Sequence, residues 1–84
     1  MLCSQRHAPT YVVCMVPKAY CTYRPDVNGN PTFCNDGPYS NYGLTLIARG
    51  QDWSDLDGEC LVAIGNIEIY KGLPEIEATD RSQV

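Results

Sequence analysis

The chain has 84 residues, 44% of them hydrophobic, and a formal net charge of −4. This length has room for one domain with a modest core that buries roughly 60–65% of the unfolded surface. No run approaches the about 18 consecutive apolar residues of a membrane-spanning helix, and residues 1–9 lack the apolar segment of a secretory signal peptide. We therefore expect a soluble protein, and we favour the cytoplasm although the sequence leaves its compartment open.

The charge is unevenly distributed along the chain. Residues 1–50 carry four cations against two acids, whereas residues 51–84 carry two cations against eight acids. Four of these acids, Asp52, Asp55, Asp57 and Glu59, fall within eight residues and would repel a phosphate backbone unless they lie away from it. This distribution weakens a nucleic-acid hypothesis, because such binding usually uses a basic stripe with interleaved aromatic residues.

The first half of the chain predicts three strands. Residues 10–23 are rich in β-branched, aromatic and Cys residues and predict a long strand, whereas residues 1–9 match no pattern and form an extension that need not be ordered. The Asn28-Gly29 pair predicts a hairpin turn before a second strand at residues 31–35. After a loop at residues 36–43, residues 44–49 predict a third strand. The domain is therefore expected to span residues 10–84.

Residues 51–56 can form one or two helical turns at most, because the segment is short and offers Asp52 and Ser54 as caps. We assign Phe33 and Trp53 to the core, and expect Trp53 to lie where the short helix closes the open end of a barrel.

The last segment, residues 57–84, predicts a long fourth strand, a tight turn at Lys71-Gly72 and a fifth strand. In the first strand the apolar positions change from even to odd numbers at Pro17. The fourth strand shows the same change at Gly65. We interpret both changes as bends or bulges, which a five-stranded barrel needs in order to close.

Two segments, GNPTFCNDGPYSNYGLTLIARGQDW and DLDGECLVAIGNIEIYKGLPEIEATDRSQV, carry a family resemblance. They resemble a group of small bacterial OB-fold domains with a recurring "PTF(L)N" strand, a Gly-rich loop and a closing hairpin that ends in "SQ(I/V)". The resemblance covers residues 11–84, although Pro17 stands where the family has Gly. It implies an all-β, five-stranded Greek-key OB barrel that acts as a binding module, often attached to nucleases or other nucleic-acid proteins.

The five cysteines show no zinc pattern, because there is no CxxC pair and the only histidine is His7. We interpret several of them as small buried hydrophobic residues. A disulfide between Cys21 and Cys34 stays open as an alternative, because a hairpin at Asn28-Gly29 places them on adjacent strands, opposite or diagonal.

In an OB fold the ligand face is formed by strands 2 and 3 and is flanked by the loops between strands 1 and 2 and between strands 4 and 5. We therefore favour a non-catalytic module that binds single-stranded nucleic acid there, with stacking rings and phosphate-binding cations. The alternatives are a protein-interaction or homo-oligomerisation module and, third, a site for a small molecule or oligosaccharide. The sequence shows no nucleophile with a base and no calcium loop, so we expect no enzyme, no cofactor, no metal and no membrane partner. The ligand-binding candidates are Tyr23, Arg24, Thr32, Asn35, Tyr39, Tyr42, Thr45, Arg49, Tyr70 and Lys71.

Overall fold

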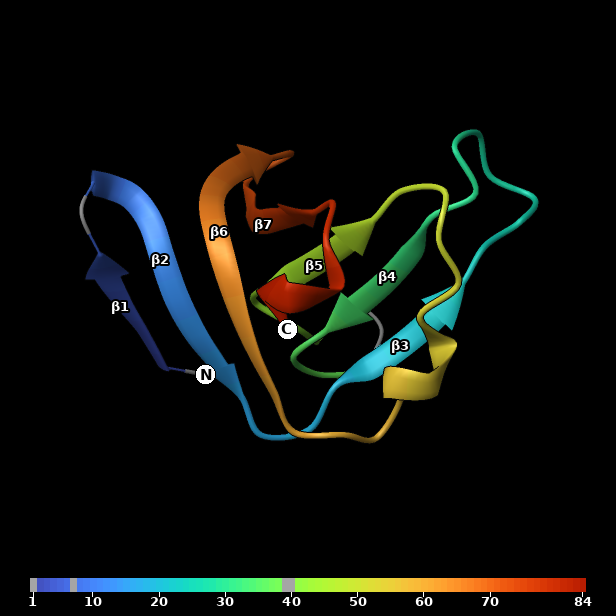
Figure 1. Ribbon diagram of the computed structural model, residues 1–84, viewed down its shortest axis with the longest axis horizontal. Helices are drawn as coiled ribbons and strands as arrows, with labels where there is room; N and C mark the ends of the chain where they lie inside the picture. The colour runs from blue at the N-terminus through green and yellow to red at the C-terminus, as the bar shows by residue number, and fades with distance from the viewer. Residues whose placement is uncertain (1, 7, 39–40) are drawn as a thin grey trace.

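In the computed structural model, residues 2–6, 8–38 and 41–84 are described, and they form an all-β protein (Figure 1). These residues contain one seven-stranded sheet in the order β1-β2-β6-β7-β5-β4-β3. The same residues contain two short 3₁₀ helices, η1 and η2. The elements are β1 (Leu2–Arg6), β2 (Ala8–Val16), β3 (Tyr20–Tyr23), β4 (Thr32–Asn35), β5 (Thr45–Ala48), η1 (Ser54–Leu56), β6 (Leu61–Tyr70), β7 (Leu73–Ala78) and η2 (Arg81–Gln83).

The predicted first strand is divided in two at Pro17. β2 pairs with β6, whereas β3 pairs with β4 on the other side of the sheet. The expected change of phase is confirmed here, because Val16 is buried before the break and Ala19 and Cys21 are buried after it. A few residues of chain therefore connect two distant parts of the sheet, as Figure 1 shows.

The prediction of a phase change at Gly65 is wrong. Leu61, Ala63 and Gly65 are buried and Ile67 packs against the core, so the odd positions of β6 face inward from Leu61 to Ile67. Val62 lies instead on the outer face, where its partner across the ladder is Met15. Both faces of this strand carry apolar side chains, and the apolar pattern alone therefore suggested a change of phase that is not present.

The five-stranded barrel is also not what the described residues form. Their sheet has seven strands and is not closed by a strand ladder, because β3 pairs with β4 alone. Two backbone bonds bridge the opening between β3 and β6. Ala19 N–H donates to the Glu59 carbonyl at 2.8 Å, and Gly58 N–H donates to the Ala19 carbonyl at 2.8 Å. The additional strand is β1, which lies within the N-terminal extension and is joined to β2 by a Cys3–Cys14 disulfide.

The turns follow the sequence closely but not completely. Lys71 and Gly72 have φ values of 50° and 81°, as a tight β6–β7 hairpin turn requires. In the β3–β4 connection, positive φ values occur at Gly29 and Asn30, one residue later than a turn centred on Asn28-Gly29. β7 then runs parallel to β5, which makes this the one parallel pair among the described strands.

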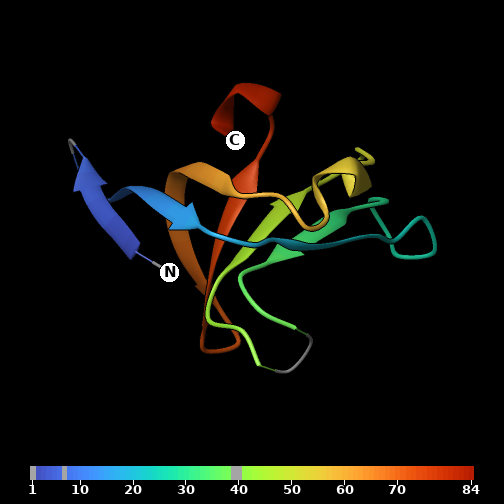
Figure 2. The ribbon, with the colours of Figure 1, turned by 90° about the horizontal axis from the view of Figure 1, so that it is seen from below.

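The core lies between the two halves of the curved sheet and contains Leu44, Leu46 and Ile76. Trp53 is 4% exposed and precedes η1, which confirms its assignment to the core. Figure 2 shows η1 and η2 on one side of the molecule and the β6–β7 turn and the loop after β4 on the opposite side. No helix in the described part of the chain is long and apolar enough to cross a membrane.

Candidate functional site

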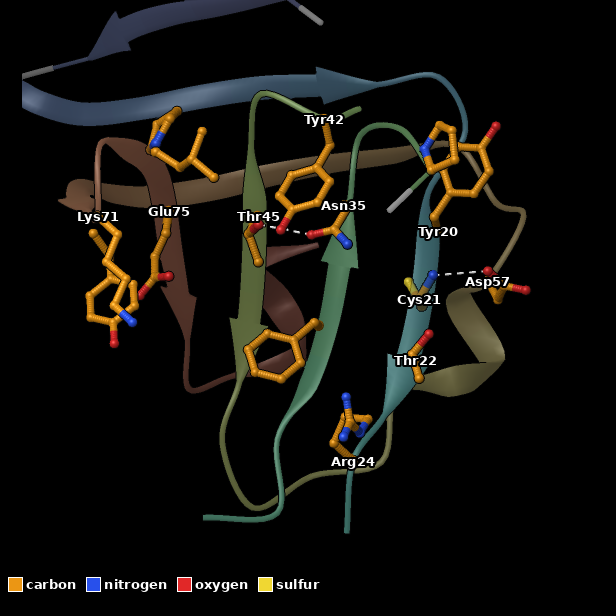
Figure 3. A pocket seen from close by; sticks show the side chains of 15 residues that line it. Tyr20, Cys21, Thr22, Arg24, Asn35, Tyr42, Thr45, Asp57, Lys71 and Glu75 are labelled. Atoms are coloured by element: carbon orange, nitrogen blue, oxygen red, sulfur yellow. Dashed lines mark hydrogen bonds between the residues drawn. The ribbon is translucent and has the colours of Figure 1, made fainter. Parts of the chain in front are cut away.

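A groove of about 630 Å³ opens on the outer face of β3, β4 and β5, next to the β6–β7 turn (Figure 3). This volume lies in the range of ordinary ligand sites, about 300–1,000 Å³. The described residues that line it come from five strands and their loops: Tyr20, Cys21, Thr22, Arg24, Phe33, Asn35, Pro38, Tyr42, Thr45, Asp57, Tyr70, Lys71, Leu73, Pro74 and Glu75.

The register of the strands determines which side chains form the floor of the groove. Successive side chains of a strand point to opposite faces. Because Cys21, Cys34 and Leu46 are buried in the core, their neighbours point outward. The ladders place Tyr20 opposite Asn35, Asn35 opposite Thr45, and Thr45 opposite Glu75. One row of outward-facing side chains therefore crosses four strands.

Four aromatic side chains among the described residues line the groove, namely Tyr20, Phe33, Tyr42 and Tyr70. Phe33 was expected in the core, and this assignment is wrong. Its neighbours Thr32 and Cys34 both face inward, so the alternation of β4 turns the ring of Phe33 toward the groove. The groove thus offers several flat apolar surfaces on which a planar ligand can stack.

The middle of the floor is polar. Thr45 Oγ1 donates a hydrogen bond to Asn35 Oδ1 at 2.8 Å, shown as a dashed line in Figure 3. The Asn35 carbonyl thus has a partner, while the amide N–H groups of an asparagine are two further donors. A ligand with carbonyl or ring-nitrogen acceptors can bind such donors.

Cations and acids occur in equal number around the groove. Arg24 comes from the start of the β3–β4 connection and Lys71 from the β6–β7 turn, and the acids of the described lining are Asp57 and Glu75. Lys71 Nζ lies 5.4 Å from the centre of the Tyr70 ring. Asp57 Oδ1 accepts the backbone N–H of Cys21 at 2.8 Å, so this carboxylate also holds β3 in place (Figure 3).

Arg24 is partly neutralised by a neighbour. Its Nη2 lies 3.0 Å from Asp26 Oδ2, and both side chains are exposed. The hydrogen bond from Arg24 lowers the pKa of Asp26 below its ordinary value. Because the pair is exposed to solvent, its attraction is weak, and a phosphate can compete for the guanidinium group.

Most of the acidic cluster at residues 52–59 lies away from the groove. Asp52 accepts hydrogen bonds from Ser54, and Arg81 Nη2 lies 2.6 Å from Asp55 Oδ2. These bonds lower the pKa values of both carboxyl groups. Asp55 lies in η1 and Asp52 two residues before it, and Figure 2 shows η1 on the side of the molecule opposite the β6–β7 turn. Of the four clustered acids, Asp57 alone lines the groove.

The structure brings some of the predicted site residues together and places others elsewhere. Thr32 is fully buried, and Tyr23 lies on the same face of β3 as the buried Cys21. Arg49 lies 3.5 Å from Glu77 and does not line the groove. Tyr39 lies outside the described residues. The predicted residues that do line the groove are Arg24, Asn35, Tyr42, Thr45, Tyr70 and Lys71.

Several lining residues were missed by the sequence interpretation. Tyr20 and Thr22 could have been found, because the phase change at Pro17 puts the even positions of the following strand on the outer face. Asp57 and Glu75 could not have been found, because the sequence alone does not show which acids of a charged segment face the groove. The missed residues are Tyr20, Cys21, Thr22, Phe33, Pro38, Asp57, Leu73, Pro74 and Glu75.

The described lining of the groove has hydroxyl groups but no imidazole that could act as a base for them. Within residues 2–6, 8–38 and 41–84, no three His, Cys, Asp or Glu side chains gather in a group that could hold a metal ion. Comparison with protein-family models, with curated proteins and with solved structures gives no match to this chain.

Proposed function

We propose that this chain is a non-catalytic binding module of the OB type that holds single-stranded nucleic acid in the groove. The main support is that four aromatic rings line the same open groove as Arg24 and Lys71. Proteins that bind single strands stack bases on exposed rings and follow the phosphates with cations. Because the groove has both kinds of group, it offers this chemistry in one place.

The strand order supports an OB-type topology in a sheet that is not closed. β2 and β3 act as two halves of a first strand, of which one half pairs with the fourth strand, β6, and the other with the second, β4. β5 and β7 are then the third and fifth strands, and β1 is an addition at the edge. In this correspondence Arg24 and Lys71 belong to the two loops that flank an OB ligand site.

The charge balance favours weak electrostatic binding in which stacking dominates. Two cations line the groove, and for a single strand log K falls by about 0.7 per neutralised phosphate for each decade of salt concentration. Two phosphate contacts thus predict a slope of log K against log salt concentration of about −1.4. The affinity then falls about 25-fold between 20 mM and 200 mM salt. This dependence is much shallower than that of a protein with a basic stripe.

Fluorescence anisotropy with a labelled oligothymidine tests the proposal. We expect binding at 20 mM salt that weakens about 25-fold at 200 mM. Tyr70→Ala removes one stacking ring and should weaken binding about 5- to 150-fold, the range equivalent to about 1–3 kcal/mol per stacked base. The matched control is Ile69→Ala, because Ile69 precedes Tyr70, is more exposed and does not line the groove. Absence of binding at 20 mM salt would overturn the proposal.

A second candidate function is protein interaction or self-association through the outer face of β2 and β6. Met15 and Val62 are partners across the ladder and are 49% and 43% exposed, and Val13 pairs with Ile64 beside them. Apolar side chains gathered on an outer face are a feature of interaction surfaces. Sedimentation of the protein at high concentration tests self-association. A monomer at all concentrations would count against it, as would an unchanged oligomer in Val62→Glu.

A further inference from the structure

One wall of the groove has little support from the rest of the sheet. β3 has four residues and is paired along one edge only, with β4. Its other edge is held by the Asp57 carboxylate, which accepts the Cys21 N–H, and by the two backbone bonds of Ala19. β3 nevertheless supplies Tyr20 and Thr22 to the groove and leads directly to Arg24.

A disulfide joins this wall to the floor. Cys21 and Cys34 are directly opposite in the β3–β4 ladder and are bonded to each other, and their exposed fractions are 7% and 5%. Their neighbours form the adjacent pairs Tyr20 with Asn35 and Thr22 with Phe33, whose four side chains all line the groove. The disulfide therefore lies behind the groove and fixes the spacing between its wall and its floor.

We infer that the Cys21–Cys34 disulfide positions the groove, and that binding requires the oxidised form. This inference rests on the proposed function and names a regulation of the same site. A dithiol reductant attacks the S–S bond, passes two electrons and two protons to the cysteine pair, and leaves as a cyclic disulfide. The product has two free thiols, and the short strand β3 then lacks its covalent attachment to β4.

A disulfide behind the groove also indicates the kind of compartment in which the protein would bind. Disulfides persist in oxidising compartments and are rare in the cytosol. Four of the five cysteines are paired in the structure, and one of the two disulfides lies behind the candidate site. A groove that depends on this bond would be active in an oxidising compartment, in place of the cytoplasm favoured from the sequence.

The second disulfide offers a matched control. Cys3–Cys14 joins β1 to β2 and contributes no residue to the groove. The two bonds close loops of similar length, with sequence separations of 11 and 13. Because loop length sets much of the entropic effect of a disulfide, their removal should have similar consequences for folding. Their consequences for binding should differ.

Oligothymidine binding by three proteins tests the inference. All carry Cys60→Ser, because the exposed Cys60 thiol could exchange with the disulfides. The first retains both disulfides, the second also carries Cys21→Val and Cys34→Val, and the third also carries Cys3→Val and Cys14→Val. Valine keeps an apolar, strand-forming side chain at each position. Circular dichroism identifies a temperature at which all three are folded.

We expect the Cys21→Val/Cys34→Val protein to bind at least tenfold more weakly than the parent, and the Cys3→Val/Cys14→Val protein to bind within twofold of it. A folded Cys21→Val/Cys34→Val protein that binds within twofold of the parent would overturn the inference. If the oxidised parent itself does not bind, the proposed function fails instead.

If the Cys21→Val/Cys34→Val protein does not fold, titration of the Cys60→Ser parent with dithiothreitol replaces it. Loss of binding while the circular dichroism spectrum stays native supports a positioning role. Simultaneous loss of binding and of the native spectrum would show that the disulfide supports the whole fold, and would overturn the inference.

Discussion

The hydroxyl of Thr32 accepts the backbone N–H of Trp53 at 2.9 Å and donates to the carbonyl of Gln51 at 2.6 Å. Thr32 lies at the start of β4 and is fully buried. Its two bonds hold the segment that precedes η1 against the sheet, where Trp53 is buried in the core. Thr32 is therefore a structural residue, although its position in the second strand suggested a ligand contact.

Thr32→Val should destabilise the protein while preserving its shape. The change leaves the buried Trp53 N–H and the Gln51 carbonyl without the hydroxyl, and an unsatisfied buried polar group costs about 1–3 kcal/mol. Urea denaturation measures the loss. Thr32→Ser is the control, because it keeps the hydroxyl and should lose less. If the free energy of unfolding of Thr32→Val lies within about 0.5 kcal/mol of the wild-type value, which is the usual range of neutral surface changes, this role is contradicted.

Gly65→Ala should also destabilise the protein, because β6 and β7 approach each other too closely there for a side chain. A Cβ on Gly65 would lie 2.9 Å from Ile76 Cγ2 and 3.3 Å from Gln83 Nε2. Overpacking of this kind costs about 1–3 kcal/mol. Thermal unfolding measures it against Gly43→Ala, whose Cβ meets only an Asp36 oxygen, at 3.8 Å. Equal melting temperatures for the two variants would be inconsistent with tight packing at Gly65.

Acid should weaken the ion pair between Asp55 of η1 and Arg81 of η2. The hydrogen bond from Arg81 lowers the pKa of Asp55, and the backbone N–H of Ser82 lowers the pKa of Asp80. A lowered folded-state pKa contributes stability above the unfolded carboxyl pKa of about 4, and this contribution is lost as pH falls through the lowered value.

The melting temperature should therefore stay nearly level from about pH 8 to pH 5 and fall below about pH 4. Asp55→Asn should lower it near neutral pH and make the acid fall smaller. Glu59→Gln, in the same acidic segment, serves as the control variant. An acid fall of unchanged size in Asp55→Asn would argue against the Asp55–Arg81 pair as a source of pH dependence.

Lys71→Gln should change the salt dependence of nucleic-acid binding more specifically than Tyr70→Ala does. Removal of one phosphate contact reduces the magnitude of the slope by about 0.7 per decade of salt. Arg49→Gln is the matched control, because Arg49 is an exposed cation that pairs with Glu77 outside the groove. If both variants give the wild-type slope, Lys71 does not contact phosphate.

The sequence predicted the strands well because local chemistry specifies them. The change of phase at Pro17 marks the break between β2 and β3, and Lys71-Gly72 marks the last hairpin. The alternation of apolar residues does not say which face is the core when both faces are apolar. For this reason the apolar even positions before Gly65 suggested a change of phase, although Val62 is exposed while Leu61 and Ala63 are buried.

Remote pairing explains the other differences. β1 is held by a partner strand and by a bond between Cys3 and Cys14, neither of which a local pattern reveals. Phe33 was assigned to the core by its hydrophobicity, but the inward positions of Thr32 and Cys34 leave it on the outer face. Nine of the fifteen described lining residues were therefore missed, since the lining depends on register rather than on residue type.

Binding in the groove can be located by titrating ¹⁵N-labelled protein with oligothymidine and recording two-dimensional NMR spectra. We expect saturable shifts in the amide signals of β3, β4 and the β6–β7 turn, while the signals of Met15 and Val62 on the outer face of β2 and β6 stay unchanged. Shifts confined to that outer face, or no shifts at low salt, would contradict the claim that the aromatic groove binds a single strand.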